Sequence, residues 1–411
     1  MNLDRREFLA VAAASLSTIA VNPTSANATE PNMTEIKPFR ISISDEAIAD
    51  LKSRLEKTRW PYATTTDWSR GQPLGFIMEL CDQWKNSYDW RKHEAAINAY
   101  PQFMTEIDGQ PIHFMHIKSK EPNAFPLVLS HGWPGSIVEY LDMIGPLSNP
   151  KAHGLDPSLA FDLVIPSLPG YGFSSPLTAP GWDSAKIAKA WDMLMKRLGY
   201  LRYGAHGGDV GSGIGKELGM LAPEGLIGTH VLQIFAFPKG EPGEMDKLTP
   251  FEKEGFANLN NFLKYNGYQI IQQKRPGTLA YGLVDSPVGV LAWNAELFFG
   301  FDGAAAKTVD RARYLTNASI YWFTGTSGSA ANIYFEDAQT GAGNREKPFN
   351  KTPTAVAVFP LDFRSVRSFA ERSNNIVHWT EMPRGGHFAA SEEPGLLVAD
   401  LRKFFGSLLA M

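Results

Sequence analysis

The stretch Gly207-Gly208-Asp209-Val210-Gly211-Ser212-Gly213 places one carboxylate among closely spaced glycines. This spacing is typical of a sharp turn from a strand into a helix, where the central side chain is exposed and the glycines relieve backbone crowding. Serine commonly occupies the central position of such a turn, but here the residue is Asp209. A carboxylate in this place can attack carbon and leave an ester on the protein itself. The expected chemistry is therefore the opening of a strained or activated C–O or C–halogen bond.

Predicted strands and helices alternate on both sides of this turn. Strands are predicted at 126–130, 160–166, 230–234, 354–359 and 376–380, and helices at 139–144, 184–198, 213–221 and 394–409. Such alternation predicts an α/β protein with a mainly parallel sheet and with ligands at the carboxyl ends of its strands. Residues 236–345 interrupt the alternation with proline- and glycine-rich turns and helical patches, so we expect this insert to be a helical lid.

Residues 34–110 are expected to form an N-terminal, mainly helical extension. Helices are predicted after Ser44 and over 76–88 and 90–100, followed by a hairpin that turns at Asp108-Gly109. The remaining chain divides into a first core segment, the lid and a second core segment, with predicted limits 111–235, 236–345 and 346–411.

Residues 1–28 contain the three parts of a twin-arginine export signal in order. Arg5-Arg6 precede an apolar run from Leu9 to Val21 that is too short to span a bilayer, and Ala26-Asn27-Ala28 is a small-x-small cleavage site. A disordered or membrane-lying N-terminus is the alternative interpretation. We expect a mature protein that is periplasmic or secreted and does not span the membrane, or a cytoplasmic form if translation starts at Met33.

Composition limits the other classes of function. The chain has 411 residues, of which 44% are hydrophobic, and a net charge of −4. The absence of a basic excess gives no support to a nucleic-acid partner. Cys81 is the single cysteine, so an internal disulfide is excluded, and its apolar helical surroundings predict a buried thiol.

The candidate catalytic groups follow the chain order of an α/β-hydrolase, which is nucleophile, acid and histidine. Asp209 is the candidate nucleophile, and His387 lies in a glycine-containing loop before the last helix. Asp362 follows the strand at 354–359 and is the candidate acid, while Glu381 follows the next strand and is its rival.

The roles of these groups follow from electrostatics. Asp209 must be ionised to attack, and the helix N-terminus after it favours the anion. His387, oriented by Asp362, would take a proton from the water that attacks the ester. The resulting oxyanion needs N–H donors. The backbone of Val210 is expected to supply one, and that of Trp133 the other.

Four motifs taken together resemble the microsomal-type epoxide hydrolases, the branch that includes juvenile hormone epoxide hydrolases. They are His131-Gly132-Trp133-Pro134, Gly170-Tyr171-Gly172-Phe173-Ser174, the Asp209 turn, and Arg384-Gly385-Gly386-His387-Phe388-Ala389-Ala390. The segment from Pro38 through Trp90 is similar to the N-terminal domain of that branch, which implies that the N-terminal extension wraps the hydrolase core. The resemblance implies hydrolysis of an epoxide to a vicinal diol without a metal or organic cofactor. The aromatic composition of the lid suggests an apolar epoxide.

The resemblance also implies two lid tyrosines that bind the epoxide oxygen and protonate it as the ring opens. Tyr268 and Tyr334 lie in matching motifs, and a phenol is a neutral donor at pH 7. The chain departs from the branch in two places. The branch commonly has glutamate as the triad acid, where this chain has Asp362, and it often has a membrane anchor where this chain has the twin-arginine signal.

Two other functions remain open at this point. A haloalkane dehalogenase shares the aspartate turn, and Trp133 could serve it as a halide-binding donor. A non-catalytic relative that binds a small apolar molecule is the second alternative. The pair Tyr268 and Tyr334 favours the epoxide over the halide, and the complete triad argues against a protein that only binds.

Overall fold

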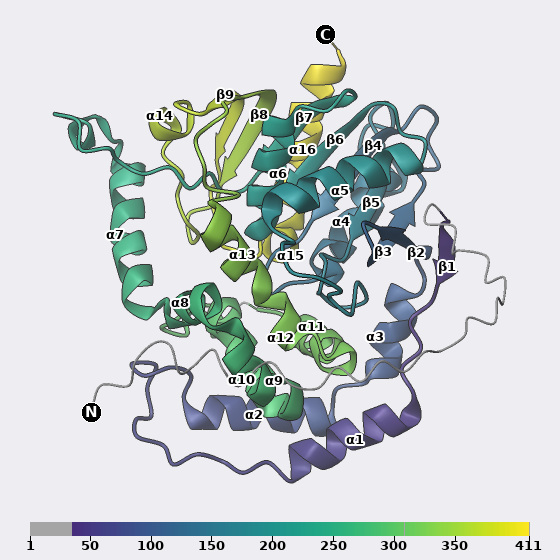
Figure 1. Ribbon diagram of the computed structural model, residues 1–411, viewed down its shortest axis with the longest axis vertical. Helices are drawn as coiled ribbons and strands as arrows, with labels where there is room; N and C mark the ends of the chain where they lie inside the picture. The colour runs from purple at the N-terminus through teal and green to yellow at the C-terminus, as the bar shows by residue number, and fades with distance from the viewer. Residues whose placement is uncertain (1–34, 308, 411) are drawn as a thin grey trace, which may run out of the picture. The chain divides into compact units, whose positions relative to one another are not determined.

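The computed structural model describes residues 35–307 and 309–410 (Figure 1). The twin-arginine signal predicted for residues 1–28 lies outside these residues, and so does the alternative start at Met33. None of the described helices combines the length and the apolar character needed to cross a membrane. The limits assigned above to the extension, the core segments and the lid stay predictions.

A nine-stranded sheet forms the centre of the described chain (Figure 1). The strand order is β1-β2-β3-β5-β4-β6-β7-β8-β9. The pairs from β1 to β5 are antiparallel and the pairs from β5 to β9 are parallel. The predicted mainly parallel sheet is therefore confirmed. The strands are β1 (Lys37–Phe39), β2 (Gln102–Ile107), β3 (Gln110–Ile117), β4 (Phe125–Ser130), β5 (Phe161–Pro166), β6 (Tyr203–Gly207), β7 (Leu226–Val231), β8 (Asn350–Val358) and β9 (Asn374–Glu381).

Apolar side chains of the central strands alternate between the two faces of the sheet. Leu127 and Leu129 of β4 pack with the helices α4 (Leu141–Ser148) and α16 (Pro394–Leu409). Val128, between them, packs on the other face with α5 (Ser184–Arg197) and α6 (Val210–Leu221). This period of two buries both faces, as a strand in the middle of a three-layered protein requires.

The strand predicted at 230–234 is displaced in the structure, where β7 ends at Val231. The N–H of Leu232 still donates to the carbonyl of Gly207, the last residue of β6, at 3.2 Å, but beyond it the backbone leaves the sheet, and the N–H of Ile234 donates to Ser365 Oγ at 2.8 Å. Leu232 and Ile234 are buried all the same. The apolar pattern of these two residues is that of a buried strand, although the pairing of β7 with its neighbours ends before them.

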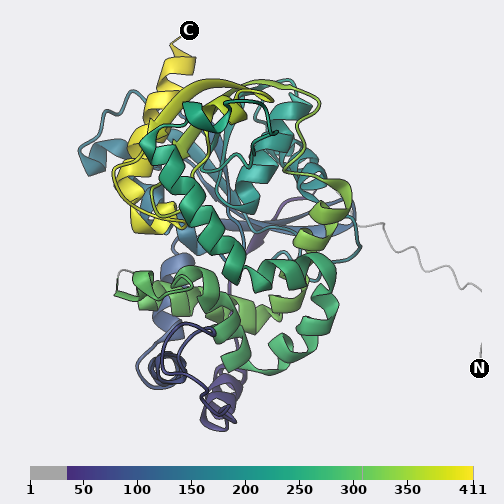
Figure 2. The ribbon, with the colours of Figure 1, turned by 90° about the vertical axis from the view of Figure 1, so that its left-hand side faces the viewer.

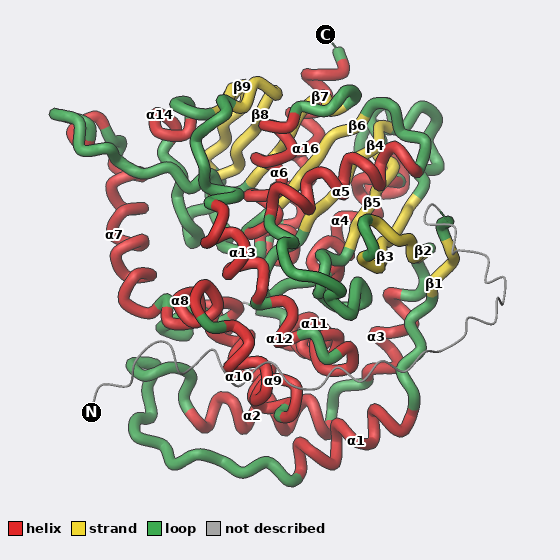
Figure 3. The backbone as a smooth tube through the Cα atoms, in the orientation of Figure 1, coloured by secondary structure: helices red, strands yellow, loops and turns green. Residues whose placement is uncertain are grey.

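The lid is helical, as predicted, and Figure 3 shows its helices in red joined by short loops. Prolines begin three of these helices, because the N–H that proline lacks has no partner in a first turn. The proline-rich turns of the sequence are therefore helix starts. The lid helices are α7 (Pro250–Tyr265), α8 (Gly267–Lys274), α9 (Pro276–Asp285), α10 (Pro287–Phe298), α11 (Arg311–Thr324), α12 (Ser327–Ala330) and α13 (Asn332–Thr340).

The N-terminal helices pack against the lid, which lies between them and the sheet in both views (Figures 1 and 2). Trp84 Nε1 donates to Ser319 Oγ at 2.8 Å, and the Tyr88 hydroxyl donates to Thr316 Oγ1 at 3.0 Å. Cys81 is buried in the same cluster, as expected. The N-terminal helices are α1 (Asp45–Glu56), α2 (Leu74–Asn86) and α3 (Trp90–Ile97). The short helices α14 (Arg367–Ala370) and α15 (Ala389–Glu392) complete the α-helices of the described residues.

Candidate active site

Asp209 lies at the sharp turn between β6 and α6. Its backbone has φ 53° and ψ −125°, a conformation that non-glycine residues rarely adopt and that is found at functional sites. A Cβ atom on Gly207 would overlap the carbonyl of Gly211, and a Cβ atom on Gly211 would overlap the carbonyl of Ser130. Both glycines are therefore required for the turn, which agrees with the predicted role of the motif.

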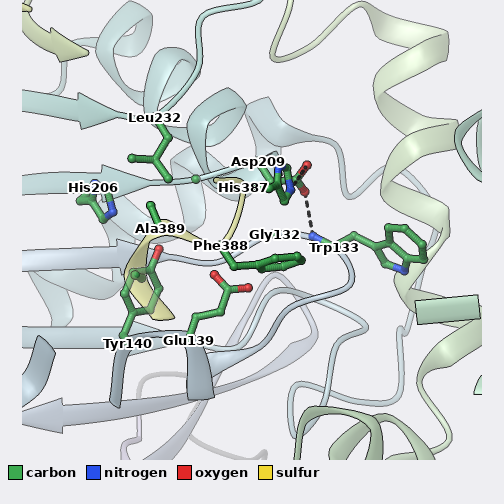
Figure 4. A pocket seen from close by; sticks show the side chains of 12 residues that line it. Gly132, Trp133, Glu139, Tyr140, His206, Asp209, Leu232, His387, Phe388 and Ala389 are labelled. Atoms are coloured by element: carbon green, nitrogen blue, oxygen red, sulfur yellow. Dashed lines mark hydrogen bonds and ion pairs between the residues drawn. The ribbon is translucent and has the colours of Figure 1, made fainter. Parts of the chain in front are cut away.

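The loop after β4 supplies an N–H donor to the Asp209 carboxylate. The backbone N–H of Trp133 donates to Asp209 Oδ1 at 2.8 Å (Figure 4). A Cβ atom on Gly132 would overlap that carboxylate, so only glycine lets this loop approach it. Val210 is the first residue of α6, and N–H groups of a first turn have no partner within their helix. The structure thus brings the N–H of Trp133 to the carboxylate and places Val210 in the first turn directly after Asp209, while their role as oxyanion donors stays a prediction.

His387 lies between two carboxylates. Its Nδ1 is 2.8 Å from Asp362 Oδ1, and its Nε2 is 3.5 Å from Asp209 Oδ2. The N–H of Leu361 donates to the carbonyl of Gly385 at 3.1 Å, and this hydrogen bond joins the loop that carries Asp362 to the loop that carries His387. This pairing brings a side chain as short as aspartate within reach of the imidazole.

The rival acid Glu381 does not reach the imidazole in this arrangement. It is the last residue of β9 and is exposed. The structure therefore brings Asp362, and not Glu381, to His387.

The two carboxylates control the charge of the imidazole. Burial by itself would lower the pKa of His387, but the charge of Asp362 and the contact with Asp209 raise it well above its usual value. Burial by itself would raise the pKa of Asp362, but the charge and hydrogen bond of His387 hold it below its usual value. The resting site therefore favours the protonated form of His387.

Both predicted tyrosines lie beside Trp133 on the lid side of the site. The ring of Tyr268, from α8, stacks on Trp133 with centroids 4.8 Å apart, and Tyr334, from α13, meets Trp133 edge-on at 5.9 Å. Burial raises the pKa of both phenols, and the nearby charge of Asp209 raises each further. Both phenols are therefore neutral and carry the proton that a ring opening needs.

The helix that carries Tyr334 is fastened to the core. Asp337, one turn further along α13, accepts hydrogen bonds from the N–H of Ser184 at 2.7 Å and from its hydroxyl at 2.6 Å. Its neighbour Glu336 accepts from the N–H of Gly181 at 2.8 Å. These contacts hold α13 at the N-terminus of α5, where the helix dipole favours carboxylates.

Gln233 is a site residue that the sequence analysis missed. Its Oε1 accepts from the N–H of Asp209 and from Ser212 Oγ, each at 2.8 Å, and its Nε2 donates to Asp362 Oδ2. One buried amide thus connects the candidate nucleophile with the candidate acid. The available signal was a polar residue within the apolar run His230-Val231-Leu232-Gln233-Ile234.

Glu139 is the second missed residue, and its carboxyl group lies in the pocket beneath His387 (Figure 4). A Cβ atom on Gly135 would overlap Glu139 Oε1, so the glycine leaves room for the carboxyl group to fold back over the loop. Burial raises the pKa of Glu139 to about 8, so the group is mainly protonated at neutral pH.

The pocket itself has a volume of about 10 Å³, close to what a single water molecule requires. It lies on the core side of Asp209 (Figure 4). Its lining is formed by Gly132, Trp133, Glu139, Tyr140, His206, Gly208, Asp209, Leu232, His387, Phe388, Ala389 and Ala390. Within residues 35–307 and 309–410, no group of three or more His, Cys, Asp or Glu side chains is arranged to hold a metal ion.

The fold and the site define an α/β-hydrolase with aspartate at the nucleophile position. A family model described as "alpha/beta hydrolase fold" matches residues 126–230, and one described as "Epoxide hydrolase N terminus" matches residues 36–140. A putative epoxide hydrolase of Stigmatella aurantiaca is 42% identical and covers 91% of this chain and 86% of its own. Epoxide hydrolase 1 of Sus scrofa is 33% identical and covers 91% and 89%.

Solved structures give the same result. The Aspergillus niger epoxide hydrolase superposes with a TM-score of 0.80 at 31% identity, covering 91% of this chain and 97% of its own. Juvenile hormone epoxide hydrolase from the silkworm Bombyx mori superposes with a TM-score of 0.81 at 28% identity, covering 92% and 95%. The chain belongs to the epoxide hydrolase family, in the microsomal-type branch that includes the juvenile hormone enzymes, and the predicted resemblance is confirmed.

Proposed function

We propose that this protein hydrolyses an apolar epoxide to a vicinal diol through an ester of Asp209. The observation that carries the proposal is the convergence of three elements on one carboxylate. Trp133 N–H binds it, His387 lies 3.5 Å from it, and the two tyrosines lie beside the Trp133 ring. The nucleophile, the base and the proton donors of an epoxide hydrolysis are therefore all present.

In the first half of the reaction, Asp209 attacks one epoxide carbon and the C–O bond of the ring breaks. The freed oxygen takes a proton from Tyr334 or Tyr268, whose raised pKa values keep them protonated until that moment. The new ester is neutral, so His387 keeps only one of its two anionic neighbours. Its pKa falls, and the proton that it releases passes through water to the tyrosinate, which becomes a neutral phenol again.

In the second half, neutral His387 takes a proton from water, and the water oxygen attacks the ester carbonyl. The N–H groups of Trp133 and Val210 bind the oxyanion that forms. The ester bond then breaks, and the departing diol oxygen takes the proton of the new carboxyl group. Asp209 is again a carboxylate and His387 again an imidazolium ion, so the cycle closes without a net gain or loss of protons.

A single turnover in heavy-oxygen water tests this mechanism. We expect the first diol to take its new oxygen from Asp209 and the heavy oxygen to appear in that side chain. Heavy oxygen found directly in the first diol would refute the covalent route. Asp209→Ala should abolish turnover, whereas His387→Gln should form the ester and retain it, which intact-protein mass spectrometry detects.

We also propose that the chain is exported through the twin-arginine pathway. The support is the sequence Arg5-Arg6 before an apolar run and a small-x-small site. Replacing both arginines by lysine keeps the charge and should leave the protein in the cytoplasm, as fractionation of the host cell would show. Equal export of the double-lysine variant would contradict the proposal.

A further inference from the structure

Three histidines and one alanine form a row across four neighbouring strands. His206 of β6 is paired with His230 of β7, His230 with Ala355 of β8, and Ala355 with His378 of β9. Asp400 of α16 covers this face of the sheet and bridges the histidines on both sides of the alanine. It contacts His230 Nε2 at 2.9 Å and His378 Nε2 at 2.8 Å.

The row ends at the candidate active site. His206 Nδ1 lies 3.0 Å from His230 Nδ1, and the His206 ring lines the same pocket as Asp209, His387 and Glu139 (Figure 4). The far end, His378, has a side chain that is 14% exposed. A continuous chain of hydrogen bonds thus connects the pocket with the edge of the sheet.

The hydrogen bonds of the row connect the tautomer of His206 to that of His230. Burial raises the pKa of Asp400, but its histidine partners outweigh this and hold it far below its usual value, so the carboxylate accepts a hydrogen bond from His230 Nε2. A His230 ring whose one proton is held on Nε2 by Asp400 accepts through Nδ1, and His206 then donates through its own Nδ1. Burial lowers the pKa of His206 well below its usual value, so this ring is neutral and its Nε2 carries a lone pair.

That lone pair lacks a partner among the described protein atoms. His206 is 1% exposed, and its Nε2 is buried without a hydrogen bond. A buried acceptor left in this way reduces stability, and such groups are commonly satisfied by an internal water. The hydroxyl of Tyr140, the neighbouring ring, already donates to the carbonyl of Ser130 at 2.8 Å.

The pocket has the size and the polar groups to supply that water. Its volume of about 10 Å³ is close to the space that one water needs, and Glu139, whose raised pKa favours the protonated form, lines the same pocket and adds a donor. His387 Nε2 is also buried without a hydrogen bond and lines the same pocket. A water held here lies on the side of Asp209 away from the lid tyrosines.

We propose that His206, with its tautomer fixed by His230 and Asp400, holds a water molecule in this pocket, and that this water supplies the hydrolysis of the Asp209 ester. His206 is thus a positioning residue that acts through the water. The inference rests on the proposed function, because it needs an ester to hydrolyse. It separates the site into a lid side for the epoxide and a core side for the water.

Two substitutions of His206 separate this role from a structural one. Asparagine places its amide near the Nδ1 position and keeps the partner of His230, but it removes the acceptor in the pocket. Glutamine reaches the Nε2 position and keeps that acceptor, but it gives up the contact with His230. We expect His206→Asn to slow ester hydrolysis about tenfold, the effect of one lost hydrogen bond, and to leave ester formation and melting temperature unchanged. His206→Gln should hydrolyse the ester faster than His206→Asn and melt at a lower temperature.

The measurement is rapid quench followed by intact-protein mass spectrometry, which follows ester formation and ester decay separately. Equal decay rates in wild type and His206→Asn would overturn the proposal. A lack of ester in wild type and in His387→Gln would instead refute the proposed function. Nitrogen-15 NMR of the resting enzyme gives a readout independent of turnover, with the signals assigned by their loss in His206→Asn. A protonated Nε2 on His206 would overturn the proposal even if the variants fail to fold.

Discussion

Replacing Asp362 by asparagine tests how far the charge of His387 depends on its buried partner. The substitution keeps the size of the side chain and removes one of the two carboxylates that face the imidazole, the one 2.8 Å from Nδ1. Two charges about 4 Å apart interact by about 4 kcal/mol at an effective dielectric constant of about 20. Since Asp362 is buried, solvent screens little of this energy.

The loss of this interaction energy slows the step in which His387 gains a proton, which is the hydrolysis of the ester. About 4 kcal/mol corresponds to a decrease of about a thousandfold in that rate. Ester formation depends on Asp209 and the tyrosines and should change little. We therefore expect the Asp362→Asn enzyme to form up to one equivalent of ester quickly and to release the diol only slowly from it.

Rapid-quench mass spectrometry measures both steps, and Glu381→Gln is the matched control. Glu381 is exposed at the end of β9, so its variant should hydrolyse the ester at the wild-type rate. The reasoning fails if Asp362→Asn hydrolyses the ester normally, and the assignment of the acid reverses if Glu381→Gln accumulates it.

Three further predictions concern the proton donors, the turn and the buried acid. Tyr334→Phe and Tyr268→Phe should each slow ester formation by about a hundredfold without slowing its hydrolysis, because each removes a proton donor; unchanged single-turnover rates would contradict this. Gly211→Ala should destabilise the protein by about 3 kcal/mol in urea unfolding, because its Cβ overlaps a backbone carbonyl, whereas Gly282→Ala, where a Cβ meets no atom within 4 Å, should stabilise α9 by about 1 kcal/mol. The raised pKa of Glu139, about 8, means that wild-type stability falls as the pH rises from about 4.5 to about 8, so Glu139→Gln should gain on wild type over that window and no further above it; a pH-independent difference would refute the assignment.

The local part of the site could be predicted from the sequence. The turn at Asp209 depends on two glycines, and steric exclusion at Gly207 and Gly211 is a property of neighbouring residues. Trp133 was predicted from its place in the loop after a strand, and the structure shows that Gly132 permits the approach of this loop to the carboxylate. Such steric constraints are visible in the sequence as glycines at the positions where a side chain cannot fit.

The non-local part could not be predicted in this way. Asp362 was preferred over Glu381 only because it follows the penultimate predicted strand. The contact between residues 361 and 385 that brings Asp362 to His387 joins two separate loops. Gln233 and Glu139 were missed because a role can be assigned to a polar residue in an apolar run only when its contacts are known. The histidine row depends on the register of four strands, and a periodic pattern within one strand does not contain that register.

The packing of the N-terminal helices on the lid has a consequence for the order of events during synthesis. Trp84 and its partner Ser319 are 235 residues apart in the chain. At a synthesis rate of about 5–20 residues per second, the ribosome needs on the order of 10–50 s to produce the partner after the tryptophan. During that interval the apolar faces of α1 and α2 lack the surface that they cover in the finished protein. These helices therefore leave the ribosome early but are among the last of the described helices to find their place.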